Sequence, residues 1–68
     1  MPYVEVQTTK GRTDAQKEKA GQAITDAFVK HMGAHFDHVY VVFGDVAGTD
    51  WLVGGETVAE RKRKRGES

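Results

Sequence analysis

Hydrophobic and polar side chains alternate at the start of the chain. Val4, Val6 and Thr8 fall on one side of an extended segment, and the other side carries Tyr3 and Glu5, followed by Gln7 and Thr9. A period of two is typical of a β-strand with one buried face. We therefore predict a strand over residues 3–9.

The next segment changes to a spacing of three and four residues, which predicts an amphipathic helix. Thr13 and Gln16 match a capping box at its start, and Gly33 suits a left-handed cap after its end. Gly21 costs this helix about 1 kcal/mol relative to alanine, which packing must offset. We predict a helix from just after Thr13 to about Met32, with an apolar stripe formed by Ala20, Ala23, Ile24, Ala27, Phe28 and Met32.

Residues 39–46 are apolar at nearly every position, which is typical of a strand covered on both faces. Strand, helix and strand in this order predict a βαβ unit with parallel strands and a right-handed crossover. A turn at residues 48–50 leads into residues 51–58, where Gly54 and Gly55 favour a small hairpin. The fold class is α+β, with one domain over residues 1–60.

One helix covers only one face of a two-stranded sheet, so the other face and both edges stay open for pairing. A chain of 68 residues without cysteine is marginally stable by itself. Self-association through the sheet is the simplest remedy. We expect a homo-oligomer.

Composition excludes several classes of protein. Without cysteine there are no disulfides, thiolate zinc sites or thiol nucleophiles. The longest apolar run, residues 39–43, is far shorter than the roughly 20 residues that span a bilayer. The start of the chain lacks the pattern of a secretory signal. We expect a cytoplasmic protein with no membrane partner.

The formal net charge of zero hides a basic end. Residues 61–68 carry five basic side chains and one acidic side chain, whereas residues 1–60 carry five basic and nine acidic ones. Such a run is usually disordered or a solvated helix end, and we predict a flexible tail. The alternative is an arm for nucleic acid. We do not favour it, because the tail lacks interleaved aromatic residues and the body is acidic.

Three histidines, His31, His35 and His38, have spacings that could suggest a metal site. Gly33 ends the helix between the first two, so they do not share a helical face. We expect no metal and no cofactor.

Pro2 directly follows the initiator methionine. Removal of Met1 before a small second residue would leave a free N-terminal proline, which is a secondary amine. Free α-amino groups titrate at about 7.7–8.0, and burial lowers this value further. A base tuned to neutral pH suits proton abstraction next to a carbonyl.

Three motifs in order give the chain a resemblance to the tautomerase superfamily, specifically to 4-oxalocrotonate tautomerase and its short-chain relatives. These motifs are residues 2–6 (PYVEV), 11–17 (GRTDAQK) and 51–56 (WLVGGE). The resemblance implies a βαβ protomer that pairs into dimers and assembles as a hexamer. It also implies a cofactor-independent isomerase, of the kind used in aromatic hydrocarbon catabolism, with an N-terminal proline as general base.

Site residues carried over from this resemblance are Pro2 as catalytic base, Arg12 and Trp51. Arg12, from a neighbouring subunit, would bind a substrate carboxylate, because a guanidinium donates two parallel hydrogen bonds to it. Trp51 would wall the pocket. Many family members carry a second arginine where this chain has Tyr40, which can donate a hydrogen bond but brings no charge.

The expected substrate is therefore a small keto or enol acid with one carboxylate, such as a 2-hydroxydienoate or an enol-pyruvate. Two alternatives remain open. The chain could be a non-catalytic or hetero-oligomeric subunit of the same fold, or a hydratase, dehalogenase or decarboxylase of the superfamily.

Overall fold

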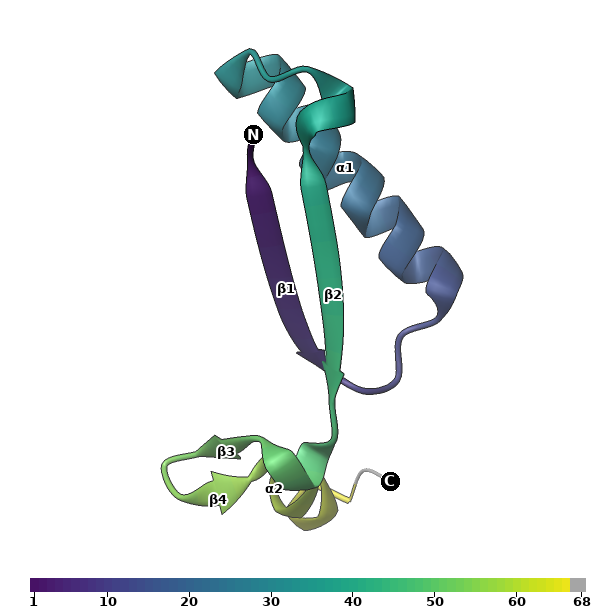
Figure 1. The fold of residues 1–68 in the computed structure, drawn as a ribbon. Helices are drawn as coiled ribbons and strands as arrows, with labels where there is room; N and C mark the ends of the chain where they lie inside the picture. The colour runs from purple at the N-terminus through teal and green to yellow at the C-terminus, as the bar shows by residue number, and fades with distance from the viewer. Residues whose placement is uncertain (67–68) are drawn as a thin grey trace.

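Two long parallel strands and one helix form the body of the molecule in the computed structural model, which describes residues 1–66 (Figure 1). Strand β1 (Tyr3–Thr9) pairs with β2 (Tyr40–Val46) in parallel, with Tyr3 opposite Tyr40 and Thr9 opposite Val46. Helix α1 (Asp14–Met32) connects them and lies against one face of the sheet. The predicted βαβ unit with parallel strands is confirmed.

Both predicted ends of α1 are confirmed. The Gln16 backbone N–H donates to the Thr13 hydroxyl at 3.1 Å, and the Thr13 N–H donates to the Gln16 side-chain carbonyl at 2.9 Å. Gly33 closes the helix in the left-handed region, with φ of 67°. These local bonds satisfy backbone groups that the helix itself leaves unpaired, so α1 begins and ends where its sequence signals stand.

Side chains of β2 meet α1 across the covered face of the sheet. A Cβ atom placed on Gly21 would lie 3.4 Å from the Phe43 ring, so the helix comes close to the strand at this position. Lys17 also forms an ion pair with Asp45 at 2.8 Å, which ties the first turns of α1 to the end of β2. This close packing between α1 and β2 offsets the cost of having a glycine, Gly21, inside the helix.

The C-terminal part of the chain lies beyond the end of β2 (Figure 1). Strands β3 (Leu52–Val53) and β4 (Glu56–Thr57) pair antiparallel around Gly54 and Gly55, whose φ values are 61° and 86°. The predicted hairpin is confirmed, but Val58 does not belong to it. Val58 begins a second helix, α2 (Val58–Lys64), because the Thr57 hydroxyl accepts the Glu60 N–H at 3.1 Å and caps it.

Four residues of the basic run, 61–64, form the second half of α2. Arg63 pairs with Glu60 within the helix, and Lys64 pairs with Glu56 of β4. The boundary that we expected between domain and tail at residue 60 therefore falls inside α2. Residues 67–68 of that tail lie outside the described residues.

The shape of the chain shows how little of its surface it covers by itself. Its radius of gyration is 15.4 Å, compared with about 11 Å for a compact domain of this length. Its accessible surface is 5193 Å², compared with about 4,200 Å² for a monomer of this mass. No residue in the range 1–66 is fully buried. The face of β2 that α1 does not cover is open in the single chain, as expected for a two-stranded sheet with one helix: Tyr40 is 48% and Val42 is 46% exposed.

Short connections complete the order of elements. A 3₁₀ turn (Phe36–His38) leads from α1 into β2, and a second one (Gly48–Asp50) leads from β2 into the hairpin. The second turn lies where the sequence predicted a turn.

Candidate functional site

Pro2 and Tyr40 come together at the start of the two parallel strands. The Tyr40 backbone N–H donates to the Pro2 carbonyl at 3.0 Å, which holds Pro2 beside the first residue of β2. Pro2 is half-buried, whereas the Tyr40 side chain is largely exposed on the face of the sheet that α1 does not cover. We call this place the proline end of the sheet.

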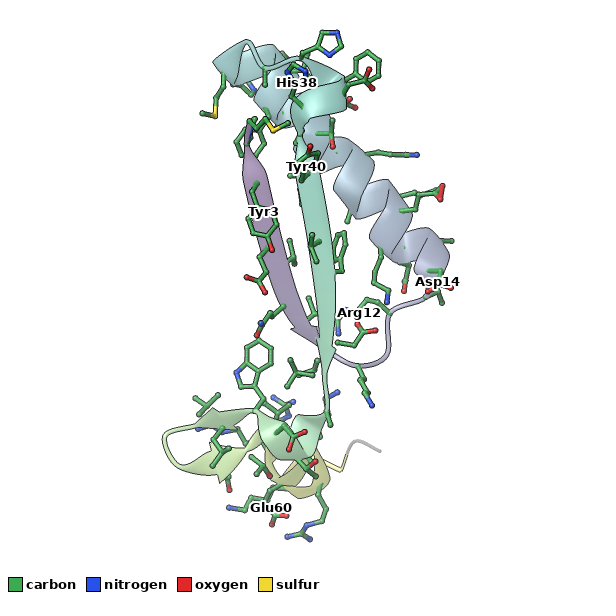
Figure 2. The ribbon with its side chains drawn as sticks, viewed as in Figure 1. Tyr3, Arg12, Asp14, His38, Tyr40 and Glu60 are labelled. Atoms are coloured by element: carbon green, nitrogen blue, oxygen red, sulfur yellow. The ribbon has the colours of Figure 1, made fainter. Side chains whose placement is uncertain are left out.

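Arg12 lies at the other end of β1, in the loop that leads into α1 (Figure 2). Its Nη1 donates to the Thr9 carbonyl at 3.2 Å and to the Thr9 hydroxyl at 3.3 Å. Seven strand residues separate Arg12 from Pro2, and at about 3.3 Å per residue they span roughly 20 Å. The structure therefore does not bring Arg12 and Pro2 together within one chain.

Trp51 belongs with Arg12 rather than with Pro2. The Lys10 N–H donates to the Val46 carbonyl at 2.9 Å, so the ends of β1 and β2 are joined, and Arg12 and Trp51 follow shortly after these ends. The half-buried Trp51 accepts the Val58 N–H at 2.8 Å through its carbonyl, which ties its backbone to the start of α2. We call this place the arginine end of the sheet.

The predicted site residues thus form two half-sites at opposite ends of a single chain. A pocket that contains the proline amine, the guanidinium and the indole would have to combine the proline end of one protomer with the arginine end of another. This arrangement is compatible with the expectation that Arg12 acts on the substrate of a neighbouring subunit.

Tyr3 is a residue of the proline end that the sequence analysis did not assign to the site. It follows Pro2 directly, pairs with Tyr40 in the strand register and is 60% exposed (Figure 2). The alternating pattern had already placed Tyr3 on the face opposite Val4. Only the register shows that its neighbour on that face is Tyr40.

His38 precedes β2 by two residues, and its ring lies 5.3 Å from that of His35. The His35 ring stacks on Phe36 at 4.9 Å, and its Nδ1 accepts the Asp37 N–H at 3.2 Å. Among residues 1–66, no group of three or more histidine, aspartate or glutamate side chains lies close enough to hold a metal ion.

Ion pairs shift the pKa of several side chains that were not predicted as site residues. The hydrogen bond that Lys17 donates to Asp45 raises the pKa of Lys17, and the bond that Lys64 donates to Glu56 raises that of Lys64. The hydrogen bond from Arg63 lowers the pKa of the Glu60 carboxyl. All of these side chains stay ionised at neutral pH; the Lys17 and Lys64 pairs connect different elements, and the Glu60–Arg63 pair lies within α2.

Two of the hollows in the described part of the chain lie between α1 and the sheet. A groove of about 560 Å³ runs between α1 and β2, and its lining includes Gly21, Phe36, Val39 and Phe43 but none of the predicted site residues. A smaller hollow of about 190 Å³ lies at the arginine end, where Arg12 lines it together with residues of β1, α1 and β2. Neither hollow contains Pro2, as expected if its pocket is completed by another protomer.

Comparison with known proteins gives a consistent result. Residues 2–61 match the Tautomerase family, described as tautomerase enzyme. A probable tautomerase of Ralstonia nicotianae is 35% identical over 60 residues, which cover 88% of this chain and 92% of the relative.

Solved structures show the same similarity. One of the 4-oxalocrotonate tautomerase isozymes from Methylibium petroleiphilum has a TM-score of 0.89 and 30% identity, covering 93% of this chain and 98% of that one. A heterohexamer 4-oxalocrotonate tautomerase from Chloroflexus aurantiacus has a TM-score of 0.83 and 27% identity, covering 88% of this chain and 97% of that one. Within residues 1–66, neither α1 nor α2 has both the length and the apolar character that a membrane crossing requires.

Proposed function

Because this chain belongs to the tautomerase family, we propose that it is a cofactor-independent tautomerase with Pro2 as its general base. Its reaction is a proton shift in a 2-hydroxydienoate or an enol-pyruvate-type acid. The observation that carries this proposal is the family match that begins at Pro2, combined with the two complementary half-sites of the chain.

Pro2 acts once Met1 is removed, because only then is its nitrogen an amine with a lone pair. An α-amino group titrates near neutrality, and a water-poor pocket favours the uncharged form that accepts a proton. Pro2 takes the proton from the enol hydroxyl or from carbon and returns it at a different position of the conjugated system. The hydrogen bond from the Tyr40 N–H to its carbonyl holds the ring in place meanwhile.

Arg12 of a second protomer binds the substrate carboxylate, and the Tyr40 phenol donates a hydrogen bond to the carbonyl or enolate oxygen. Trp51, also from another protomer, excludes water from the amine. A charge-assisted hydrogen bond is roughly twice as strong as a neutral one. Because Tyr40 is neutral, it stabilises a developing enolate less than a guanidinium would, and it offers a second carboxylate little attraction.

Assembly into a homo-oligomer, as a hexamer, completes the pocket. The chain leaves none of its described residues fully buried and exposes about 1,000 Å² more than a compact monomer of its mass. Two large apolar side chains of the hairpin, Leu52 and Val53, are 56% and 44% exposed. Burying them between protomers provides the driving force for association.

The direct test follows the ultraviolet absorbance of phenylenolpyruvate and of 2-hydroxymuconate during ketonisation, with intact mass recorded on the same sample. We expect the Pro2→Ala variant to lose at least about a hundredfold in kcat, the usual contribution of a positioned general base. Equal rates for Pro2→Ala and the unaltered protein, or an intact mass that retains Met1 in active protein, would contradict the proline mechanism.

A second candidate function is a non-catalytic or hetero-oligomeric subunit, and Tyr40 is the observation that favours it. One similar protein, from Chloroflexus aurantiacus, is a heterohexamer. If this chain needs a partner that supplies an arginine, the purified chain will be inactive while Tyr40→Arg gains activity. An active purified chain would exclude this role.

A further inference from the structure

The open face of the sheet has an unusual composition at the proline end. Tyr3 and Tyr40 are register partners on neighbouring strands, which lie about 4.8 Å apart in a sheet. Partners in a parallel register point to the same face, and both phenols are exposed, at 60% and 48%. The two tyrosine side chains therefore leave neighbouring positions on the same face, and Tyr3 directly follows Pro2 in the chain (Figure 2).

Charge on this face is negative. Glu5 is exposed two residues after Tyr3 on the same side of β1, and the neutral Gln7 amide donates to it at 3.5 Å. Within the described strands, the other side chains that alternate onto this face are uncharged: those of Gln7 and Thr9 on β1, and of Val42 and Val46 on β2. A ligand that extends from Pro2 along this face meets aromatic rings and then a carboxylate.

We infer that Tyr3 is a specificity-determining residue, which together with Tyr40 holds the uncharged, planar end of an aryl monocarboxylate. Aromatic rings pack favourably on one another in offset or edge-to-face geometry, and two neighbouring phenols present such surfaces to an aryl group. Glu5 repels a second carboxylate at the same place, because like charges a few ångströms apart disfavour each other. The inference rests on the proposed function, since it assumes that substrate lies against Pro2.

Ligand binding tests this inference without any need for turnover. Isothermal titration compares cinnamate, an aryl monocarboxylate, with cis,cis-muconate, an aliphatic dicarboxylate, on the assembled protein. We expect Tyr3→Ala to weaken the binding of cinnamate about tenfold and to change the binding of muconate by less than about twofold. Tyr3→Phe should keep most of the affinity for cinnamate because it keeps the ring. Glu5→Gln should strengthen the binding of muconate several-fold and leave the affinity for cinnamate unchanged.

Matched controls separate specificity from assembly. Asp26→Asn removes an exposed carboxylate from α1, away from the open face, and should change the affinity for neither ligand. Size-exclusion chromatography of each variant reports assembly, and Tyr3→Leu replaces Tyr3→Ala if the latter dissociates, because it keeps apolar bulk without the ring.

Three results would overturn the inference. The Tyr3 variants could lose affinity for both ligands equally, they could keep their full affinity for cinnamate, or the unaltered protein could bind muconate more tightly than cinnamate. Failure of the proposed function is a different result, an unaltered ketonisation rate in Pro2→Ala. That result leaves the cinnamate and muconate titrations to decide the role of Tyr3 by themselves.

Discussion

Pro2 and Arg12 lie at opposite ends of β1, separated by the full length of a seven-residue strand. The backbone bond from Tyr40 holds Pro2 at one end, and the two bonds to Thr9 hold Arg12 at the other. A base and a carboxylate-binding group that act on one small substrate must lie within a few ångströms of it. In the proposed mechanism they therefore come from different protomers.

Subunit complementation tests this arrangement. Pro2→Ala and Arg12→Ala are each expected to be inactive when assembled alone. After the two are unfolded, mixed in equal amounts and refolded, about one quarter of the sites in a closed, randomly assembled oligomer combine an intact proline with an intact arginine. We expect about a quarter of the activity of the unaltered protein, measured by ketonisation of phenylenolpyruvate.

The control for complementation is a mixture of the unaltered protein with the double variant that carries both substitutions. In that mixture an intact site also arises in about one quarter of cases, so the two mixtures should match. No recovery of activity in the mixture of single variants would mean that the two residues act from the same chain, and full activity of Arg12→Ala by itself would mean that Arg12 does not act.

Stability is expected to depend on protein concentration, because the single chain leaves no described residue fully buried. When folding is linked to association, the melting temperature rises with protein concentration by mass action. Circular dichroism melts over a hundredfold range of concentration, with analytical ultracentrifugation of the same samples, measure this. A melting temperature that stays constant while the protein sediments as a monomer would contradict the assembly.

Gly21→Ala is expected to stabilise the protein by up to about 1 kcal/mol, because alanine is the better helix former. Its Cβ would meet the Phe43 ring at 3.4 Å and a Val41 methyl group at 3.9 Å, which are ordinary van der Waals distances. Denaturant titration at a fixed protein concentration measures the free energy of unfolding.

The matched substitution Gly33→Ala should have the opposite sign. Gly33 has a φ of 67° and open space around its Cβ position, so only the backbone conformation opposes alanine, at about 1–2 kcal/mol. Destabilisation by Gly21→Ala of the same size as by Gly33→Ala would mean that α1 lies closer to β2 than the structure shows.

The ion pair of Lys17 with Asp45 is expected to give a stability contribution that is lost in alkali. The hydrogen bond that Lys17 donates to Asp45 raises the pKa of Lys17 above its ordinary value of 10.5. Since the folded state holds this proton more tightly than the unfolded state, the contribution is complete below pH 10.5 and disappears as the pH rises through the folded-state pKa.

Lys17→Met should therefore lower the melting temperature by a few degrees at neutral pH, and the difference from the unaltered protein should narrow above pH 10.5. The effect is small because both side chains are partly exposed, at 22% and 36%. Lys19→Met, at an exposed position of the same helix, controls for the loss of a charge. An equal effect of both substitutions would show that the ion pair contributes nothing specific.

The sequence by itself determined the local elements of this protein. The strand over residues 3–9, the capping box of Thr13 with Gln16 and the left-handed turn at Gly33 all follow from contacts within a few residues, which the sequence states directly. The hairpin at Gly54 and Gly55 follows for the same reason. Val58 was misassigned because the Thr57 cap competes locally with an extended hairpin, and the paired charges of Glu56 and Glu60 support the helix.

Only the tertiary structure decided how distant segments meet. Tyr3 and Tyr40 are 37 positions apart, and their pairing depends on the register that α1 imposes when it packs against the sheet. The same packing holds Pro2 beside Tyr40 and leaves Arg12 and Trp51 at the far end. The candidate residues therefore lie in two half-sites at opposite ends of the sheet. Register and separation of this kind arise from long-range packing, because no short stretch of sequence contains both partners.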